Sequence, residues 1–316
     1  MLTFFTLILG FIPLIWGANV LVNGCTSLVK NSKVSNWTIG LTVVAFGTST
    51  PEISVNLFAS FQADNFITMD NVLGSNIFNI AIILGFIFFI SPFAIKSEAL
   101  KLETIFAFLG AIVLLVVSKD RFFNNSATNE ISRSEGILML IFFFVFFLIL
   151  LNTVKIAPKN DSEQSDFSKP KSISYIIMGL ILLISGGQLI VYSTQNFVEY
   201  FNVTERIVAL IIISAGTSLP ELVTAYIASR KGTPELIMGN IVGSNIFNIF
   251  FVLGISSIIR DVGVWKSINL DMIIHLIISS LLFVFIFTNN RLFQKINGGL
   301  LIVLYLAYVY YLLFIM

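Results

Sequence analysis

Long apolar stretches alternate with short polar breaks along almost the whole chain. A membrane-spanning helix needs about 20 mostly apolar residues, and ten stretches approach or exceed that length. We therefore expect an all-α polytopic membrane protein with ten transmembrane helices, the first of which is retained because it has no basic leader segment before it. The stretches cover roughly residues 2–29, 36–61, 68–91, 101–118, 135–153, 173–198, 205–229, 234–259, 269–288 and 295–315.

The longest polar stretch, residues 152–172, lies at the middle of the chain. It contains Pro, Ser and charges of both signs but few apolar residues. Such a composition is typical of a flexible linker. The linker divides the chain into two units of five predicted helices each, residues 1–151 and 173–316.

The distribution of basic residues predicts how the chain is oriented in its membrane. The loops that follow odd-numbered predicted helices hold 12 Lys and Arg, whereas those that follow even-numbered helices hold 6. Because cytoplasmic loops carry the excess of basic residues, we expect the linker to be cytoplasmic and both termini to be extracytoplasmic. We expect the membrane to be a plasma (inner) membrane.

The two halves of the chain contain the same motifs at one fixed offset. Residues 47–52 read Gly-Thr-Ser-Thr-Pro-Glu, and residues 216–221, 169 positions later, read Gly-Thr-Ser-Leu-Pro-Glu. Residues 71–79 read Asn-Val-Leu-Gly-Ser-Asn-Ile-Phe-Asn and reappear at the same offset as residues 240–248, with changes only to apolar residues. We interpret this as an internal duplication.

The odd number of helices in each half makes the predicted repeat inverted. A second copy that follows five spans enters the membrane from the opposite side. Many transporters are built this way, and they bind their substrate near the midplane where the two repeats meet.

Composition narrows the class of protein further. Only 11% of residues are charged, where a soluble domain has about a quarter, so most of the surface must face lipid. The net charge of +1 argues against an electrostatic nucleic-acid binder. The single Cys, Cys25, reads as a small packed residue, and one His excludes a multi-His metal site. We expect no cofactor.

Two acidic residues interrupt otherwise apolar predicted helices at equivalent positions, Glu52 and Glu221. A charge at the centre of a membrane helix costs about 2.5–3.5 kcal/mol on insertion scales. No Lys or Arg lies near the middle of any predicted helix. The missing counter-charge indicates a bound cation, although protonation or a salt bridge to a loop residue would also neutralise the two acids.

Hard oxygen donors surround both acids in the sequence. Ca2+ takes six to eight oxygen ligands, whereas the thiolates and imidazoles that select softer metals are absent from these segments. Serine and asparagine four residues apart share a helix face. The candidate donors are Thr48, Ser49, Ser75 and Asn79 in the first half and Thr217, Ser218, Ser244 and Asn248 in the second.

Proline and glycine in each motif predict that helices two and seven are broken. Pro51 and Pro220 remove a backbone donor and clash with the preceding turn. Irregular backbone at membrane depth persists only where its polar groups are satisfied, and a cation does so directly. A proline kink alone is also common in membrane helices. The carbonyls that we expect to lose their helical partners are those of Ala45, Thr48, Ser214 and Thr217.

The charge balance suggests a mechanism. Two carboxylates balance one Ca2+, and they can equally bind two or three Na+ in neighbouring places. The two sets of ions share the glutamate oxygens, so their binding is competitive. Alternating access to such a site converts the competition into counter-transport.

These paired motifs resemble the alpha-1 and alpha-2 repeats of the cation/Ca2+ exchanger superfamily, most of all its prokaryotic Na+/Ca2+ exchangers. The resemblance covers nearly the whole chain. It implies a non-enzymatic antiporter with Ca2+ and Na+ as substrates, and helices one and six as a sliding gate. It also implies a central Ca2+ site formed by Glu52, Glu221 and the carbonyls of Thr48 and Thr217. One flanking Na+ site would be formed by the Ala45 carbonyl, Ser49 and Ser244, and the other by the Ser214 carbonyl, Ser218 and Ser75. Asn79 and Asn248 would line the middle.

Departures from the family pattern carry further expectations. K+-dependent relatives have an acid at the position of Asn248, so we predict exchange that is independent of K+. Ser214 stands where Ala is more usual, with little expected effect because the carbonyl is the ligand. The linker is too short for large Ca2+-binding regulatory domains. Gly17 and Gly186 are either flexing points of the gate or packing glycines. One chain holds both halves of the site, so a monomer could function.

Three alternatives remain to be separated. A Ca2+/H+ antiporter would use the same carboxylates, but relatives of that type resemble G-N-x-x-E patterns, which this chain lacks. His275 is the one imidazole that could relay a proton, but it lies outside the repeated motifs and reads as a packed residue. A channel would show no saturable counterflow. An intramembrane protease would need paired Asp, Ser and His, or a zinc motif, and none is present.

Overall fold

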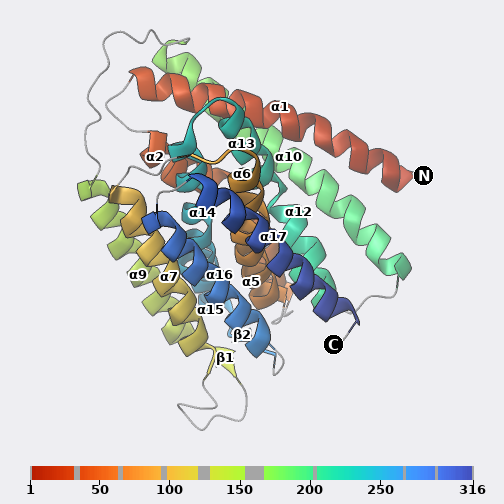
Figure 1. Cartoon of the computed structure of the whole chain (residues 1–316). Helices are drawn as coiled ribbons and strands as arrows, with labels where there is room; N and C mark the ends of the chain where they lie inside the picture. The colour runs from red at the N-terminus through yellow and green to blue at the C-terminus, as the bar shows by residue number, and fades with distance from the viewer. Residues whose placement is uncertain are drawn as a thin grey trace.

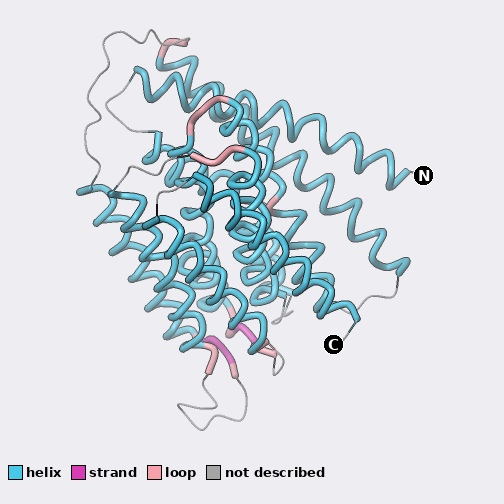
Figure 2. Tube along the Cα trace, in the orientation of Figure 1, coloured by secondary structure: helices cyan, strands magenta, loops and turns pink. Residues whose placement is uncertain are grey.

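The computed structural model describes residues 2–31, 36–62, 67–93, 98–119, 129–153, 167–201, 205–265, 268–288 and 291–314. Almost all of these residues are helical (Figures 1 and 2), so the predicted all-α class is confirmed. The exception is one pair of two-residue strands, β1 (Glu130–Ile131) and β2 (Val262–Gly263), which pair antiparallel. Most of the predicted linker, residues 154–166, lies outside the described residues.

Two long helices, α1 (Leu2–Asn31) and α10 (Lys169–Phe201), run antiparallel along one side of the bundle (Figure 1). Glycines allow this close approach. A Cβ added at Gly17 would lie 2.9 Å from the Gly179 carbonyl oxygen, and one at Gly186 would lie 2.8 Å from the Gly10 carbonyl oxygen. Neither contact leaves room for a side chain, so the packing interpretation of Gly17 and Gly186 is confirmed.

The segments predicted as helices two and seven, called span two and span seven below, are each divided into several helical pieces. Span two consists of α2 (Asn36–Ile39), the π-helix η1 (Gly40–Val44), α3 (Ala45–Thr48) and α4 (Thr50–Gln62). Span seven consists of α11 (Glu205–Ile207), the π-helix η3 (Val208–Ile213), α12 (Ser214–Thr217) and α13 (Leu219–Arg230).

The breaks fall at equivalent serines of the two halves. Ser49 has φ −80° and ψ 6°, and Ser218 has φ −84° and ψ 4°, outside the α-helical region. Each serine lies two residues before a proline, whose ring disfavours a continuous helix. In span seven, the two parts are bent by 46°.

Span three and span eight form the centre of the bundle. Span three consists of α5 (Ile67–Phe78), η2 (Asn79–Leu84) and α6 (Gly85–Ile90); span eight consists of α14 (Pro234–Ile246), η4 (Phe247–Val252) and α15 (Leu253–Ile259). In the most apolar part of each span, 78% of the residues of span three and 83% of those of span eight are buried. The corresponding share in the other candidate spans is 22–50%. Their π-turns begin at equivalent positions, within one residue, and were not predicted from the sequence.

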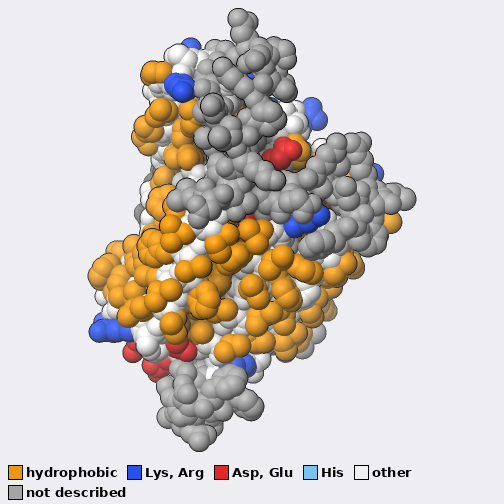
Figure 3. All heavy atoms as spheres, turned by 90° about the vertical axis from the view of Figure 1, so that its left-hand side faces the viewer, with side chains coloured by type: hydrophobic (Ala, Val, Ile, Leu, Met, Phe, Trp, Pro, Cys, Tyr) orange, Lys and Arg blue, Asp and Glu red, His pale blue; other side chains and the backbone are white. Residues whose placement is uncertain are grey.

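Four further helices complete the bundle: α7 (Glu98–Val117), α9 (Arg133–Thr153), α16 (Asn269–Thr288) and α17 (Arg291–Phe314). Large apolar side chains are exposed on them, for example Phe142 and Phe144 on α9. Figure 3 shows hydrophobic side chains over a broad part of one face. A surface of this kind suits contact with lipid rather than with water.

The number of candidate spans is smaller than predicted. Within the described residues, eight helices are long and apolar enough to cross a membrane, or nine if the bent pair in span seven counts as one. Predicted helix two, residues 36–61, is helical on both sides of Ser49 but is not among them. The break divides it into pieces that are too short to qualify singly. Helix six also begins earlier than predicted, at Lys169.

Contacts between loops separate the two ends of the bundle. At one end, β1 and β2 join the loops after helices four and eight, and the Trp265 indole donates to Asp70 at the start of span three. At the other end, the Phe93 N–H donates to Gln294, and Lys231 donates to Asn23 of α1. The first end gathers segments that follow even-numbered helices and the second those that follow odd-numbered ones.

Candidate functional site

The two motif glutamates lie directly after the breaks, in the first turns of α4 and α13, and both are fully buried. Each carboxylate accepts a hydrogen bond from a hydroxyl of the other half of the chain. Ser49 Oγ donates to Glu221 Oε1 over 3.2 Å, and Ser218 Oγ donates to Glu52 Oε1 over 3.1 Å. The breaks therefore place four residues from the two halves in one buried site.

Spans three and eight add hydroxyls to this site. Ser244 Oγ donates to Glu221 Oε1 over 3.4 Å, so that this oxygen faces two serines. Ser75 Oγ lies 3.5 Å from the Thr217 hydroxyl oxygen. Thus the hydroxyls of Ser49 and Ser244 are brought together on one carboxylate oxygen, and that of Ser75 contacts the second motif.

Asparagines of the duplicated motif join span three to span eight. Asn79 Nδ2 donates to Asn245 Oδ1 over 3.0 Å, and Asn248 Nδ2 donates to Asn76 Oδ1 over 3.2 Å. All four asparagines are buried. Asn76 and Asn245 belong to the duplicated motif but were not among the predicted site residues, because only Asn79 and Asn248 lie four residues from the motif serines.

Four buried oxygens of this site accept no hydrogen bond in the structure: Glu52 Oε2, Glu221 Oε2, Asn79 Oδ1 and Asn248 Oδ1. A buried polar atom without a partner costs about 1–3 kcal/mol, and more if it is charged. All four are acceptors, which only a proton donor or a cation can satisfy. Within the described residues, the hydrogen-bonding side chains around both carboxylates are hydroxyls rather than Lys or Arg.

Two other residues of the predicted ligand set, Thr48 and Ser214, use their hydroxyls in structural contacts. Thr48 Oγ1 donates to the Val44 carbonyl over 3.0 Å and lies 3.1 Å from Asn240 Oδ1. Ser214 Oγ donates to the Ala209 carbonyl over 2.7 Å and lies 3.1 Å from the Asn71 carbonyl oxygen. Asn71 and Asn240, also missed in the sequence, thus connect each central span to a broken one.

One expectation about the backbone is wrong. The carbonyls of Ala45 and Ser214 keep their helical partners, because Ser49 N–H donates to Ala45 over 3.0 Å and Ser218 N–H donates to Ser214 over 3.1 Å. An α-helical bond reaches four residues back, so Pro51 removes the donor of Gly47 instead. Each carbonyl oxygen also accepts from a threonine hydroxyl, Ser214 from Thr217 Oγ1 over 3.2 Å and Ala45 from Thr48 Oγ1 over 3.5 Å. A cation at either carbonyl would therefore replace the hydroxyl contact.

Two other residues considered in the sequence, Cys25 and His275, are buried away from the contacts of the candidate site. Cys25 is buried in α1 with its thiol free, as expected of a packed residue. His275 is buried in α16 and is not among the residues that hydrogen-bond to the glutamates. In the described part of the chain, no group of three or more His, Cys, Asp or Glu could hold a metal ion. A cation at the candidate site would depend on two carboxylates and neutral oxygens.

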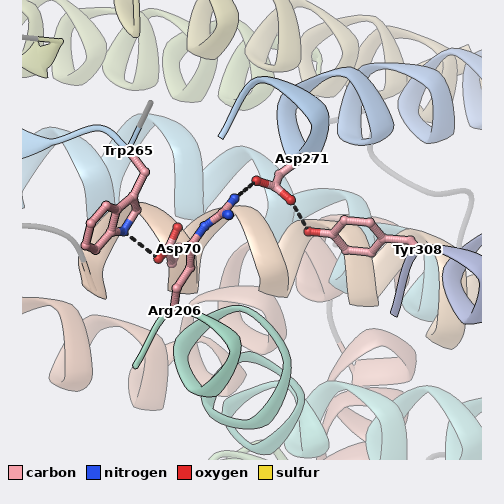
Figure 4. A network of polar contacts seen from close by, with 5 residues as sticks. All are labelled: Asp70, Arg206, Trp265, Asp271 and Tyr308. Atoms are coloured by element: carbon pink, nitrogen blue, oxygen red, sulfur yellow. Dashed lines mark hydrogen bonds and ion pairs between the residues drawn. The ribbon is translucent and has the colours of Figure 1, made fainter. Parts of the chain in front are cut away.

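Figure 4 shows a second cluster of polar side chains, which includes Trp265, two residues after β2. Arg206 of α11 forms an ion pair with Asp271 of α16, and Tyr308 of α17 donates to the same carboxylate over 2.6 Å. Trp265 Nε1 donates to Asp70 of α5 over 3.0 Å. We name these five residues the terminal cluster. The only sequence signal for it is an Arg and an Asp close to the starts of two predicted helices, residues 205–229 and 269–288.

Comparisons with known proteins agree over both halves of the chain. A family model described as "Sodium/calcium exchanger protein" matches residues 2–152 and 171–314. CaxA of Alkalimonas amylolytica is 36% identical over 265 residues, which cover 81% of this chain and 80% of that protein. The sodium/calcium exchanger MaX1 of Methanosarcina acetivorans is 28% identical over 346 residues, covering 99% of each.

A solved structure has the same fold. The sodium-calcium exchanger NCX_Mj, soaked with 100 mM Na+ and 10 mM Sr2+, superposes with a TM-score of 0.82 at 26% identity. The superposition covers 98% of this chain and 97% of that one. The arrangement of helices is therefore shared along nearly the full length.

Proposed function

The chain belongs to the sodium/calcium exchanger protein family, and from that premise we propose that it exchanges Ca2+ for Na+ across its membrane by alternating access. The observation that carries the proposal is a set of four buried oxygens without donors. Two of them belong to carboxylates whose hydrogen-bonding partners, among the described residues, are hydroxyls. A transported cation supplies the missing positive charge. An enzyme is not among the relatives named above.

The ligands that we propose follow the grouping of side chains. Ca2+ takes Glu52, Glu221 and the carbonyls of Thr48 and Thr217. One Na+ takes the Ala45 carbonyl, Ser49 and Ser244, and a second takes the Ser214 carbonyl, Ser218 and Ser75. Asn79 and Asn248 line the space between them. The shared contact of Ser49 and Ser244 with Glu221 Oε1 supports the first Na+ group.

Competition between the two ions gives the coupling. Ca2+ requires both negative charges and six to eight oxygens, so it needs Glu52 and Glu221 at once. Na+ uses the same carboxylate oxygens through Ser49 and Ser218, which already contact them. One set of ions therefore leaves before the other binds, and each reorientation of the protein carries one set across.

We also propose the architecture that this mechanism needs: ten spans in two inverted repeats, residues 1–151 and 173–316. The linker between α9, which ends at Thr153, and α10, which begins at Lys169, is cytoplasmic, and the termini lie outside a plasma membrane. The separation of loop contacts between the two ends of the bundle supports this arrangement. Helices α1 and α10, which pack mainly on each other through glycine, form the sliding gate.

A specific observation also keeps proton coupling as the second candidate. Glu52 Oε2 and Glu221 Oε2 each lack a hydrogen-bond donor in the structure. A proton bound to either oxygen would neutralise the carboxylate as Na+ does. The same site would then give a Ca2+/H+ antiporter.

Uptake of radiolabelled Ca2+ into proteoliposomes loaded with Na+ and diluted into Na+-free buffer tests the proposal. Uptake that needs the outward Na+ gradient and survives a proton ionophore supports Na+/Ca2+ exchange. Uptake that ignores Na+ and follows an imposed pH gradient supports the proton-coupled alternative. Glu52→Gln and Glu221→Gln remove the signal in either case, whereas Glu235→Gln, at a half-buried acid in the first turn of α14, serves as the matched control.

A further inference from the structure

The four asparagines between spans three and eight form a closed arrangement of hydrogen bonds. Asn76 Nδ2 donates to the backbone carbonyl of Asn245, and Asn245 Nδ2 donates to the backbone carbonyl of Asn76, each over 3.3 Å. The side-chain oxygens of the same two residues accept from Asn248 and Asn79. Asn76 and Asn245 thus use both ends of their amides within the protein.

The backbone carbonyls decide which way these amides face. A side-chain amide has an oxygen and a nitrogen of similar shape, so its two orientations differ only in hydrogen bonding. A backbone carbonyl can only accept, and therefore Asn245 must turn its Nδ2 toward the carbonyl of Asn76. Its Oδ1 then faces Asn79. The same reasoning fixes Asn76 through the carbonyl of Asn245.

The orientation of Asn79 follows from that of Asn245. Because Asn245 Oδ1 is an acceptor, Asn79 must present its Nδ2 to it, and the Asn79 oxygen points the other way. That oxygen is buried and has no donor, and the equivalent oxygen of Asn248 is in the same position. If either amide were flipped, two oxygens would face each other and an N–H group would replace the free oxygen.

We propose that Asn76 and Asn245 are positioning residues. Asn76 keeps the amide oxygen of Asn248, and Asn245 that of Asn79, available to the cation in place of the amide nitrogen. The inference rests on the proposed cation site but not on Na+ as the coupling ion. Neither positioning residue contacts the cation itself. Each sets the polarity of one ligand of the opposite half.

The test is Ca2+ binding to the full-length protein in detergent, measured by calorimetry for Asn245→Leu with and without Asn79→Asp. Leucine removes both hydrogen bonds of Asn245, so the Asn79 amide can flip. Loss of residues that orient metal ligands weakens affinity about 10- to 100-fold, and we expect that range here. A carboxylate has oxygens on both sides, so Asn79→Asp restores affinity at least tenfold in the Asn245→Leu background and improves it less in wild type.

A purely structural role for Asn245 would not produce that rescue. Wild-type affinity in Asn245→Leu, or an equal effect of Asn79→Asp in both backgrounds, overturns the proposal. The mirror pair, Asn76→Leu with Asn248→Asp, provides the same comparison if Asn245→Leu does not fold. Proton-coupled transport would contradict Na+ exchange but leave this result intact, whereas absence of Ca2+ binding in wild type would contradict both the site and the positioning role.

Discussion

Two groups of buried acids in this protein have opposite surroundings. In the terminal cluster, Asp271 is paired with Arg206 and accepts from Tyr308, and Asp70 accepts from Trp265 (Figure 4). In the candidate site, the described side chains that donate to Glu52 and Glu221 are hydroxyls, and each carboxylate has an oxygen without a donor among them. Burial is nearly complete in both groups.

The difference shows two ways to accommodate buried negative charge. Removing a carboxylate from water costs several kcal/mol, which a well-placed ion pair with further hydrogen bonds can offset. The terminal cluster offsets the cost with fixed protein groups and joins α11, α16 and α17. The candidate site leaves the cost uncompensated within the protein, so that an exchangeable cation compensates it. The first arrangement stabilises a structure, and the second gives selectivity for positive ions.

Neutralising the glutamates should have the largest effect on transport. Glu52→Gln and Glu221→Gln should each reduce gradient-driven Ca2+ uptake to that of empty liposomes, because Ca2+ then has half of its counter-charge. The same variants should unfold no earlier than wild type without divalent cations, since an uncompensated charge is removed. Earlier unfolding of both variants in a thermal melt would mean that these acids are structural.

Breaking the ion pair should have the opposite consequence. Asp271→Asn leaves Arg206 buried with a neutral partner, and loss of one member of a buried pair costs about 3–5 kcal/mol. We expect this loss in chemical denaturation, with Ca2+ affinity changed less than twofold. The double variant Arg206→Met, Asp271→Leu should recover most of the stability. A large loss of Ca2+ affinity in Asp271→Asn would show that the terminal cluster and the candidate site are functionally coupled.

The serines that donate to the glutamate of the other half, Ser49 and Ser218, should have intermediate effects. Ser49→Ala and Ser218→Ala each remove one hydroxyl beside a carboxylate, and a hydrogen bond to a charged group contributes about 1.5–3 kcal/mol. We expect Na+ affinity to fall at least tenfold in each, measured by Na+ competition with Ca2+ uptake. Ser54→Ala, at an exposed serine one turn along α4, is the control. Unequal losses would show that the halves contribute differently.

The smallest expected effect is that of K+. Asn248 is neutral and its amide oxygen is one of the free acceptors, so no extra negative charge is present to hold a second monovalent cation with Ca2+. Ca2+ uptake should be the same when K+ replaces choline on the Ca2+ side at fixed membrane potential. Stimulation by K+ would show that Asn248 does not have the role that we assign to it.

The sequence predicted the features that are local in the chain. Glu52 and Glu221 stood out because an acid in an apolar stretch is unusual anywhere in a membrane protein. The breaks at Ser49 and Ser218 followed from the prolines two residues later. These signals depend on neighbouring residues alone, and so they needed no knowledge of packing.

Features that depend on distant contacts were not predictable. Arg206 and Asp271 are 65 residues apart, and no residue near either one in the sequence indicates the other. The pairing of Ser49 with Glu221 joins positions 172 apart. The π-helices η1 and η3 pack against α14 and α5, which are distant in the sequence. The expectation for Ala45 and Ser214 failed for a local reason, since the carbonyl that proline deprives is two residues further along in each motif.

The exchange of hydroxyls between the two motifs has a consequence for how such a gene can change. Each carboxylate has its serine on the other copy of the duplicated segment, so neither copy encodes a complete binding unit. A substitution in one copy alters the surroundings of the acid in the other, and the two copies must therefore evolve together. Their fusion in one reading frame guarantees that they are made in equal numbers and always meet.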